Sequence, residues 1–424
     1  MSANSSTIAA MAVECGDLTL GEGLLAIVRP ALNLLEPGCL LSVLSTCPAL
    51  KDDLSAWCRL EHHQYMGCNT IGTRERHVIA RGSLNVALGT RESGITLPLR
   101  NGQLTAADML ALVPMPDRAD PSTGFAPRGA RVEPGGPAYP FSLLDAGHTA
   151  PPEVAMLFDQ ATSSQWNAAT DIPWHTIKPL PPRLEAAVGQ VMTFLAENEV
   201  SALYVPSRFL SRIHPAYLEV SMFLATHMAD EARHIDVFLK RARAAGGGLG
   251  ISSVTTSRSL LSLLEINDFT EAAFLLSVLG EGTFIDLLRY VEEHAPDEAT
   301  AELARRARLD ESRHVHFGLA HVRHALRHDA TLYARLESAV RRRAASLHGS
   351  GEAPAAVQDA LTILAAGSAG AQGADDPNAV RRGHEAYRNL LKTMSENRIK
   401  RLENAGFTAA QSQTLSDLHT PNFM

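Results

Sequence analysis

The spacing of apolar residues divides the chain into a helical C-terminal part and an N-terminal part of mixed pattern. From Arg183 onward, apolar residues recur every three or four positions, which predicts amphipathic helices. We expect seven helices, over 183–205, 215–244, 268–294, 297–327, 330–347, 354–366 and 378–404. The first should stop at Pro206, which lacks a backbone N–H, and the second at the glycines that begin with Gly246.

The N-terminal part, over positions 1–82, instead alternates short extended stretches with helices. The predicted order is a strand at 11–18, a helix at 24–35, a strand at 40–44 and a helix at 49–60. Pro37 and Gly38 make the turn before the second strand. We therefore expect a small α/β domain over residues 1–82.

Between these parts, residues 83–182 show no regular period. Proline and glycine are dense from 114 to 140 and again near 173 to 182, which predicts a long connector. Trp166 and Trp174, two of the three tryptophans, lie close together in this segment. We expect them to anchor the connector against the next domain, which covers residues 183–424.

Composition supports a mainly α fold, because only 5% of the residues are aromatic while alanine, leucine and valine are abundant. The net charge of −8 argues against phosphate-driven binding of nucleic acid. No apolar run reaches the roughly 20 residues that span a bilayer, and the nearest run is interrupted by Glu281 and Asp286. The N-terminus does not resemble a secretion signal, so we expect a cytoplasmic protein that does not insert into membranes.

The cysteines are confined to the start of the chain. All five lie between Cys15 and Cys68, and none forms a C-x-x-C pair, which argues against a zinc site. An odd number of cysteines without a secretion signal predicts reduced thiols. Any metal site in the rest of the chain must therefore use histidine, aspartate or glutamate.

One pattern occurs twice, once in the second and once in the fourth long helix. Residues 230–234 and 310–314 both read Asp-Glu-x-Arg-His. In a helix, residues i and i+3 lie on one face, so the glutamate and histidine of each copy can bind the same metal. A single Glu-x-x-His is common by chance, but two copies in this extended form are much more specific.

Each copy follows a helix that offers a further glutamate. Glu281 lies on an apolar face of the third long helix, where an unpaired charge is costly. In the first helix, Glu199 continues the core stripe, while Glu197 lies about 200° away and is expected in solvent. We therefore choose Glu199 and Glu281 as the additional ligand candidates.

One glutamate from each of two helices and a Glu-x-x-His from each of two others form the ligand set of carboxylate-bridged di-iron and di-manganese bundles. Carboxylates bridge two metal ions, and neutral imidazoles complete the coordination while leaving positions for dioxygen. We expect two Fe ions, with Fe/Mn or Mn/Mn as alternatives, and dioxygen as co-substrate. The predicted ligands are Glu199, Glu231, His234, Glu281, Glu311 and His314.

Residues beside these ligands fit a supporting role. Asp230 and Asp310 can accept the distal N–H of a ligand histidine on the partner helix. Arg233 and Arg313 can neutralise these two aspartates. His227, four residues before Glu231, is either a third imidazole ligand or a core histidine with a hydrogen-bond partner, and both interpretations stay open.

With these motifs, residues 183–327 resemble the ferritin-like superfamily, in particular its dioxygen-activating di-iron oxygenases and oxidases. Relatives include ribonucleotide reductase small subunits, bacterial multicomponent monooxygenases and arylamine N-oxygenases. The resemblance implies that the six predicted ligands hold the metal ions. Arylamine N-oxygenases carry an extra histidine that resembles His227, although theirs lies in the second motif helix. Phe238 occupies the position of the radical tyrosine of the reductase subunits.

The N-terminal domain, over positions 1–82, resembles the SirA/TusA-like sulfur-carrier family. The resemblance rests on Leu-Glu-Pro-Gly at 35–38, Leu-Ser-Thr-Cys-Pro-Ala-Leu at 44–50 and Asp-Leu-Ser-Ala-Trp-Cys at 53–58. That family carries a persulfide on the cysteine of a Cys-Pro motif, and Gly21 occupies this position here. The resemblance therefore implies a domain for docking or stability.

We predict an enzyme that oxidises a small organic substrate by hydroxylation, desaturation or N-oxygenation, with an electron donor or reductase as partner. A homodimer is left open. The alternative is handling of iron or peroxide, as in ferritins and rubrerythrins, although the missing C-x-x-C pairs exclude a rubredoxin module. A third alternative, a non-enzymatic binding protein with a relic metal site, is disfavoured by six intact ligand positions.

Overall fold

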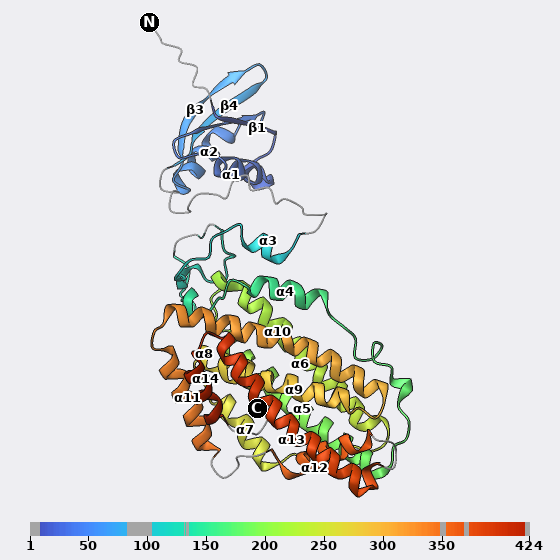
Figure 1. Ribbon diagram of the computed structural model, residues 1–424. Helices are drawn as coiled ribbons and strands as arrows, with labels where there is room; N and C mark the ends of the chain where they lie inside the picture. Colours follow the sequence, from blue (N-terminus) through green and yellow to red (C-terminus); the bar gives the residue numbers. More distant parts are fainter. Residues whose placement is uncertain are drawn as a thin grey trace. The chain divides into compact units, whose positions relative to one another are not determined.

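The computed structural model describes residues 9–82, 104–130, 132, 135–347, 353–368 and 373–419. The chain forms two compact units: residues 1–94 with 129–136, and residues 95–128 with 137–424 (Figure 1). Most of the segment predicted as a connector is thus part of the second, helical unit. Its residues 83–103 lie outside the described ranges.

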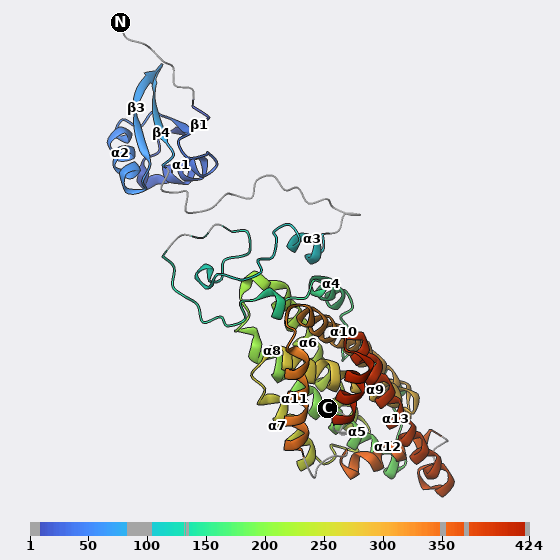
Figure 2. The same ribbon diagram turned by 60° about the vertical axis from the view of Figure 1, so that its left-hand side comes forward.

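Over its described residues 9–82, the N-terminal unit forms a four-stranded sheet with two α-helices. Its elements are β1 (Met11–Gly16), α1 (Leu24–Asn33), β2 (Leu40–Ser45), α2 (Leu50–Leu60), β3 (Gln64–Ile71) and β4 (Arg74–Ala80). The strand order is β1-β2-β4-β3, with β1 and β2 parallel and the other pairs antiparallel. β1, α1, β2 and α2 match the predicted elements. Figure 2 shows α1 and α2 next to the strands of the sheet.

The hairpin of β3 and β4 was not predicted from the sequence. Its apolar alternation is weak, because β4 begins with the charged residues Arg74, Glu75 and Arg76. The turn between the strands contains Gly72 with φ +63°, a left-handed conformation that favours glycine. The hairpin is therefore held by the pairing of β4 with β2, which the local sequence pattern does not indicate.

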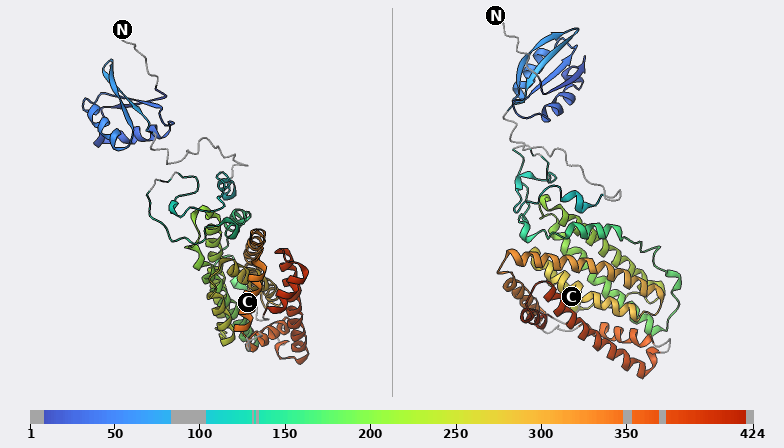
Figure 3. Two further views of the ribbon diagram at one scale, coloured as in Figure 1. Left: turned by 90° about the vertical axis from the view of Figure 1, so that its left-hand side faces the viewer. Right: turned by 45° about the horizontal axis from the view of Figure 1, so that its top comes forward.

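The helical unit contains a bundle of long helices. Three of them are α5 (Pro182–Leu210), α6 (Leu218–Ala244) and α10 (Glu298–His328). The fourth is a continuous stretch made of α8 (Phe269–Ala273), a π-helical segment (Phe274–Glu281) and α9 (Gly282–Glu293). Views from several sides show that α10 runs beside both α6 and α9 (Figures 1, 2 and 3). The predicted mainly α fold with a small N-terminal α/β unit is confirmed.

Further helices surround this bundle. They are α3 (Ala106–Leu110), α4 (Val154–Ser163), α7 (Val254–Leu264), α11 (Leu332–Ser346), α12 (Ala355–Gly367), α13 (Pro377–Asn404) and α14 (Ala409–Leu418). The sequence analysis predicted α11, α12 and α13 but not α3, α4, α7 or α14. Within the described ranges, no helix is both long enough and apolar enough to cross a bilayer.

One prediction about the long helices was wrong in detail. The first helix does not stop at Pro206 but continues to Leu210. Val205, Pro206 and Phe209 are buried on one side of this turn, so its packing offsets the hydrogen bond that proline cannot donate. The predicted helix over 268–294 is present as one helical stretch from Phe269 to Glu293. Its middle is a fully buried π-helical segment, which ends at Glu281.

Candidate metal centre

The bundle brings together all seven side chains that the sequence marked as ligand candidates. Glu199 comes from α5, His227, Glu231 and His234 from α6, Glu281 from the end of the π-helical segment, and Glu311 and His314 from α10. Each of them is at most 1% exposed to solvent. Four separate segments of the bundle therefore direct polar side chains into one dry region.

The ligand atoms form two overlapping groups. One contains Glu199, Glu231, His234 and Glu311, and the other contains His227, Glu231, Glu281 and His314. Within each group, the potential ligand atoms lie within 4.8 Å of one another. Glu231 belongs to both groups, so its carboxylate lies between two neighbouring positions that could each hold an ion.

The histidines of the two motifs are placed alike. His234 Nδ1 lies 3.2 Å from Glu231 Oε2 and 3.4 Å from Glu311 Oε1. His314 Nδ1 lies 2.9 Å from Glu231 Oε1 and 3.3 Å from Glu311 Oε2. In both cases the Nδ1 atom faces the glutamates, so the duplicated sequence produces a duplicated geometry.

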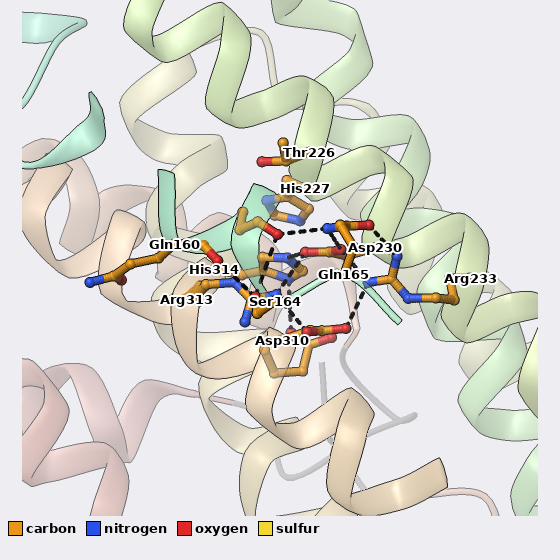
Figure 4. Close-up of polar contacts among 12 residues, drawn as sticks. Gln160, Ser164, Gln165, Thr226, His227, Asp230, Arg233, Asp310, Arg313 and His314 are labelled. Carbon is orange, nitrogen blue, oxygen red and sulfur yellow. Dashed lines mark hydrogen bonds and ion pairs between the residues drawn. The ribbon is translucent and has the colours of Figure 1, made fainter. Parts of the chain in front are cut away.

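The other ring nitrogen of each histidine meets an aspartate on the opposite motif helix. His234 Nε2 lies 3.2 Å from Asp310 Oδ2. His314 Nε2 lies 3.3 Å from Asp230 Oδ2 (Figure 4). A carboxylate can only accept, so it orients the Nε2–H tautomer and leaves the Nδ1 lone pair toward the glutamates. The contacts are those the sequence analysis expected of these aspartates.

Two arginines hold the aspartate pair. Arg233 donates to Asp230 and, over 2.9 Å, to Asp310. Arg313 likewise contacts both aspartates, at 3.2 Å for Asp230. The charges of the two aspartates are therefore balanced by the two arginines and leave the inner glutamates uncompensated.

Sequence reasoning missed two further residues of this shell, both from the segment before α5. Trp166 Nε1 donates to Asp310 Oδ2 over 2.7 Å, and the guanidinium of Arg233 lies 4.8 Å from the centre of its ring. Gln165 donates to Asp230 over 3.2 Å and accepts from Arg233 over 2.7 Å (Figure 4). Trp166 packs into the core, as expected. Its indole N–H also donates to an aspartate beside the ligands, which no local sequence pattern indicates.

His227 faces the centre as well. Its Nε2 lies 3.0 Å from Glu281 Oε1 and 3.1 Å from Glu231 Oε1. Its ring is parallel to that of His314, with centroids 3.8 Å apart. Among the described residues, neither ring nitrogen has a partner with hydrogen-bond geometry. The contacts therefore support the ligand interpretation of His227 over a core histidine with a hydrogen-bond partner.

Burial and mutual repulsion perturb the pKa values of the glutamates. Burial, followed by the charges of Glu231 and Glu311, raises the pKa of Glu199 well above its usual value. Burial also acts to raise the pKa of Glu231, but three surrounding histidines hold it well below the usual value. The cluster therefore combines one carboxyl with a raised pKa and one with a lowered pKa in the same buried region.

The four glutamates carry more negative charge than the described structure compensates. None of Glu199, Glu231, Glu281 and Glu311 has an arginine or lysine partner within the described ranges, and each keeps a buried oxygen without a hydrogen bond. Buried, unsatisfied carboxylates are costly. Two divalent cations would balance the charge of four carboxylates and would coordinate the oxygens that lack a hydrogen bond. The residues of the centre therefore fit a pair of metal ions.

A small apolar cavity adjoins the centre at His227. Its walls include Phe209, Leu224, Leu276 and Phe317, and its volume is about 20 Å³. A cavity needs roughly 10–15 Å³ measured in this way to hold one water molecule. The space therefore accommodates a molecule of the size of water or dioxygen.

Comparisons with known proteins establish no family for the chain. No family description matches it, and no curated protein does. Among solved structures, it is similar to variants of an R2-like ligand-binding oxidase with a reconstituted Mn/Fe cofactor, at 19% and 20% identity and a TM-score of 0.45 in both cases. These alignments cover 59% of this chain and 92% and 91% of the oxidase chains. A variant with an Fe/Fe cofactor gives 19% identity and a TM-score of 0.44 over 59% of this chain and 92% of that one.

Proposed function

We propose that the helical unit is a dioxygen-dependent oxidase or oxygenase that holds two metal ions and oxidises a small organic substrate. The observation that carries the proposal is the pair of overlapping ligand groups that share Glu231. Their four glutamates and three histidines form the donor set of carboxylate-bridged metal pairs. Fe/Fe, Mn/Fe and Mn/Mn pairs all suit carboxylate and imidazole donors.

In this proposal, each ion has its own terminal ligands. Glu199 and His234 would hold one ion, while Glu281, His314 and His227 would hold the other. Glu231 and Glu311 would lie between them, since both contact the Nδ1 atoms of the two motif histidines. Two such ions, when bound, supply the electrons that reduce dioxygen.

The residues around the centre would prepare it for this chemistry. Asp230 and Asp310 keep the histidine lone pairs toward the ions. The apolar cavity at His227 gives dioxygen a dry position next to the ligands. Because this cavity is too small for an organic molecule, we expect side chains in its wall to move when substrate binds.

An electron donor is part of the proposal. Trp166, Asp310 and His234 form a hydrogen-bonded series that leads to the centre, because Asp310 accepts from both rings. Tryptophan can be oxidised by one electron, and each link in the series is short. We infer that a reductase or small reductant delivers electrons by this route.

Metal analysis after anaerobic loading with Fe²⁺ tests the centre. The wild-type protein should bind about two irons per chain. Glu231→Ala should lose both, because Glu231 belongs to both ligand groups. Glu197→Ala is the matched control: it lies on the same helix as Glu199 but bonds with Ser252. A folded wild-type protein that binds no transition metal would refute the proposal.

Oxygen uptake by the loaded protein distinguishes the two classes of function. An oxidase or oxygenase should consume dioxygen repeatedly when a reductant and an oxidisable amine, phenol or hydrocarbon are supplied, and should yield an organic product. Uptake that instead ends with a ferric mineral and no organic product would identify an iron-handling protein and overturn the oxidase proposal.

For the N-terminal unit we propose a SirA/TusA-like domain that does not carry sulfur. Gly21 occupies the position of the carrier cysteine. Cys15, the nearest cysteine, is only 3% exposed, and burial followed by the charge of Glu14 raises the pKa of its thiol. A buried thiol with a raised pKa is a poor nucleophile. Mass spectrometry after incubation with a persulfide donor should therefore find no sulfur added at Cys15.

A further inference from the structure

The hairpin of β3 and β4 gathers three side chains that the proposed oxidation does not use. Cys68 on β3 lies directly opposite His77 on β4. Glu75 precedes His77 by two positions and therefore shares its face of the sheet. A sulfur, a carboxylate oxygen and a ring nitrogen of these residues lie within 4.8 Å of one another.

Two atoms of this cluster are buried and unsatisfied. His77 is 0% exposed, and within the described ranges neither its Nε2 nor Glu75 Oε2 has a hydrogen-bond partner. The two atoms lie 3.5 Å apart. Buried polar atoms are normally paired, because burying an unpaired one costs free energy. A ligand bound between these two atoms would remove that cost. Burial also lowers the pKa of His77, although Glu75 opposes this, and a neutral imidazole can donate its lone pair.

Tyr65 fixes the orientation of His77. Its hydroxyl lies 2.8 Å from His77 Nδ1. When His77 donates its Nδ1–H to the hydroxyl oxygen, the Nε2 lone pair is free and lies near Glu75 Oε2. A ligand histidine that donates its second ring N–H to a neighbour is the usual arrangement at protein metal sites.

We propose that Cys68, Glu75 and His77 form a binding site for one zinc-like divalent cation. One thiolate, one carboxylate and one imidazole are donors that Zn²⁺ accepts, and three protein ligands leave a fourth tetrahedral position open. Cys68 and Glu75 are partly exposed, so an ion can enter from solvent. The site depends on the register of the hairpin, which places Cys68 opposite His77. A search of the sequence for C-x-x-C pairs therefore does not find it.

Cobalt(II) provides a specific test in the full-length chain. A thiolate bound to Co²⁺ gives a charge-transfer band in the near ultraviolet, and the helical unit cannot produce this band because it contains no cysteine. With reduced thiols and the helical centre first loaded with Fe²⁺ in the absence of oxygen, the wild-type protein should develop the band when Co²⁺ is added, and should lose it when Zn²⁺ is added. Cys39→Ser, at another partly exposed cysteine, should behave like the wild type.

Variants of the three ligands complete the test. Cys68→Ser replaces one atom and should abolish the band while the circular dichroism stays unchanged. Glu75→Gln should weaken cobalt binding, and Tyr65→Phe should weaken it roughly tenfold because it only orients His77. The proposal is overturned if the wild-type protein gives no band, or if Cys68→Ser keeps it.

Discussion

At the scale of residues, the two motifs differ in one respect that bears on the chemistry. His227 precedes Glu231 by four positions, while the matching residue before Glu311 is Ala307. The ligand group that contains Glu281 therefore has two histidines, and the group that contains Glu199 has one. The two ions would then occupy unequal sites, and they should bind with different affinities.

His227→Ala tests this inequality. It should lower metal affinity at the group containing Glu281 and His314 by roughly tenfold or more, because an inward-facing imidazole is lost. The other group should keep its affinity. A titration that resolves two binding steps measures both. His316→Ala, an exposed histidine on α10, should change neither step. Two unchanged steps in His227→Ala would make His227 a core histidine.

Trp166→Phe tests the electron route. The substitution keeps an aromatic ring but removes the N–H that donates to Asp310. We expect metal content to stay at the wild-type value while reductant-driven oxygen consumption falls severalfold. Trp174→Phe is the control, because the Trp174 N–H donates to the carbonyl of Ala168 and not to the centre. Equal rates in both variants would exclude the route.

At the scale of elements, local signals predicted most helix positions. The end of α6 follows from its glycines, and α10 begins after Asp297, whose side chain accepts from Thr300 N–H. The continuation of α5 through Pro206 and the π-helical segment before α9 were not predictable. Both occur where a helix is buried on several sides, so packing outweighs the backbone preference of single residues.

Gly318→Ala probes the contact that holds the π-helical segment. A Cβ at this position of α10 would lie 2.7 Å from Ser277 Cβ, so one element must shift. Alanine normally stabilises a helix relative to glycine, but here we expect a loss of about 1–3 kcal/mol in the free energy of unfolding. The shift would also displace Glu281 and weaken the second metal-binding step.

Urea denaturation and the metal titration measure these two effects. Gly21→Ala is a suitable control, because the added Cβ would meet no atom closer than 4.0 Å. A Gly318→Ala protein more stable than the wild type would show that the segment can move away without cost.

At the scale of the whole molecule, a buried histidine outside the centre should make the stability depend on pH. Burial, followed by the charges of His324 and His148, lowers the pKa of His321 to about 3, although the backbone of Thr149 opposes the shift. The unfolded chain binds a proton there near pH 6.5. The stability is thus full above pH 6.5 and declines as the pH falls toward 3, because only the unfolded state takes up the proton.

Comparison with His321→Gln isolates this contribution. Between pH 6.5 and 5.5 the wild type should lose about 1 kcal/mol more than the variant. Glutamine can still hydrogen-bond with Thr270, which lies 3.0 Å from His321 Nε2. Loss of helical circular dichroism in urea, at equal metal content, measures the difference. Parallel pH profiles for the two proteins would mean that His321 titrates normally in the folded state.

The sequence by itself determined what depends on spacing within one helix. Glu231 with His234, and Glu311 with His314, share a face because residues i and i+3 are neighbours in any α-helix. The predicted ligands, including Glu199 on its core stripe, follow from this periodicity alone. For the same reason the sequence predicted a mainly α fold with a small α/β unit at its start.

Only the tertiary structure decided which distant residues meet. It pairs Asp310 with His234 across two helices and brings Trp166, from a segment without periodicity, to the same aspartate. It also places Cys68 opposite His77 through the register of a hairpin that no local pattern predicted. Such contacts depend on how helices pack and strands align, and local periodicity along the chain does not contain this information.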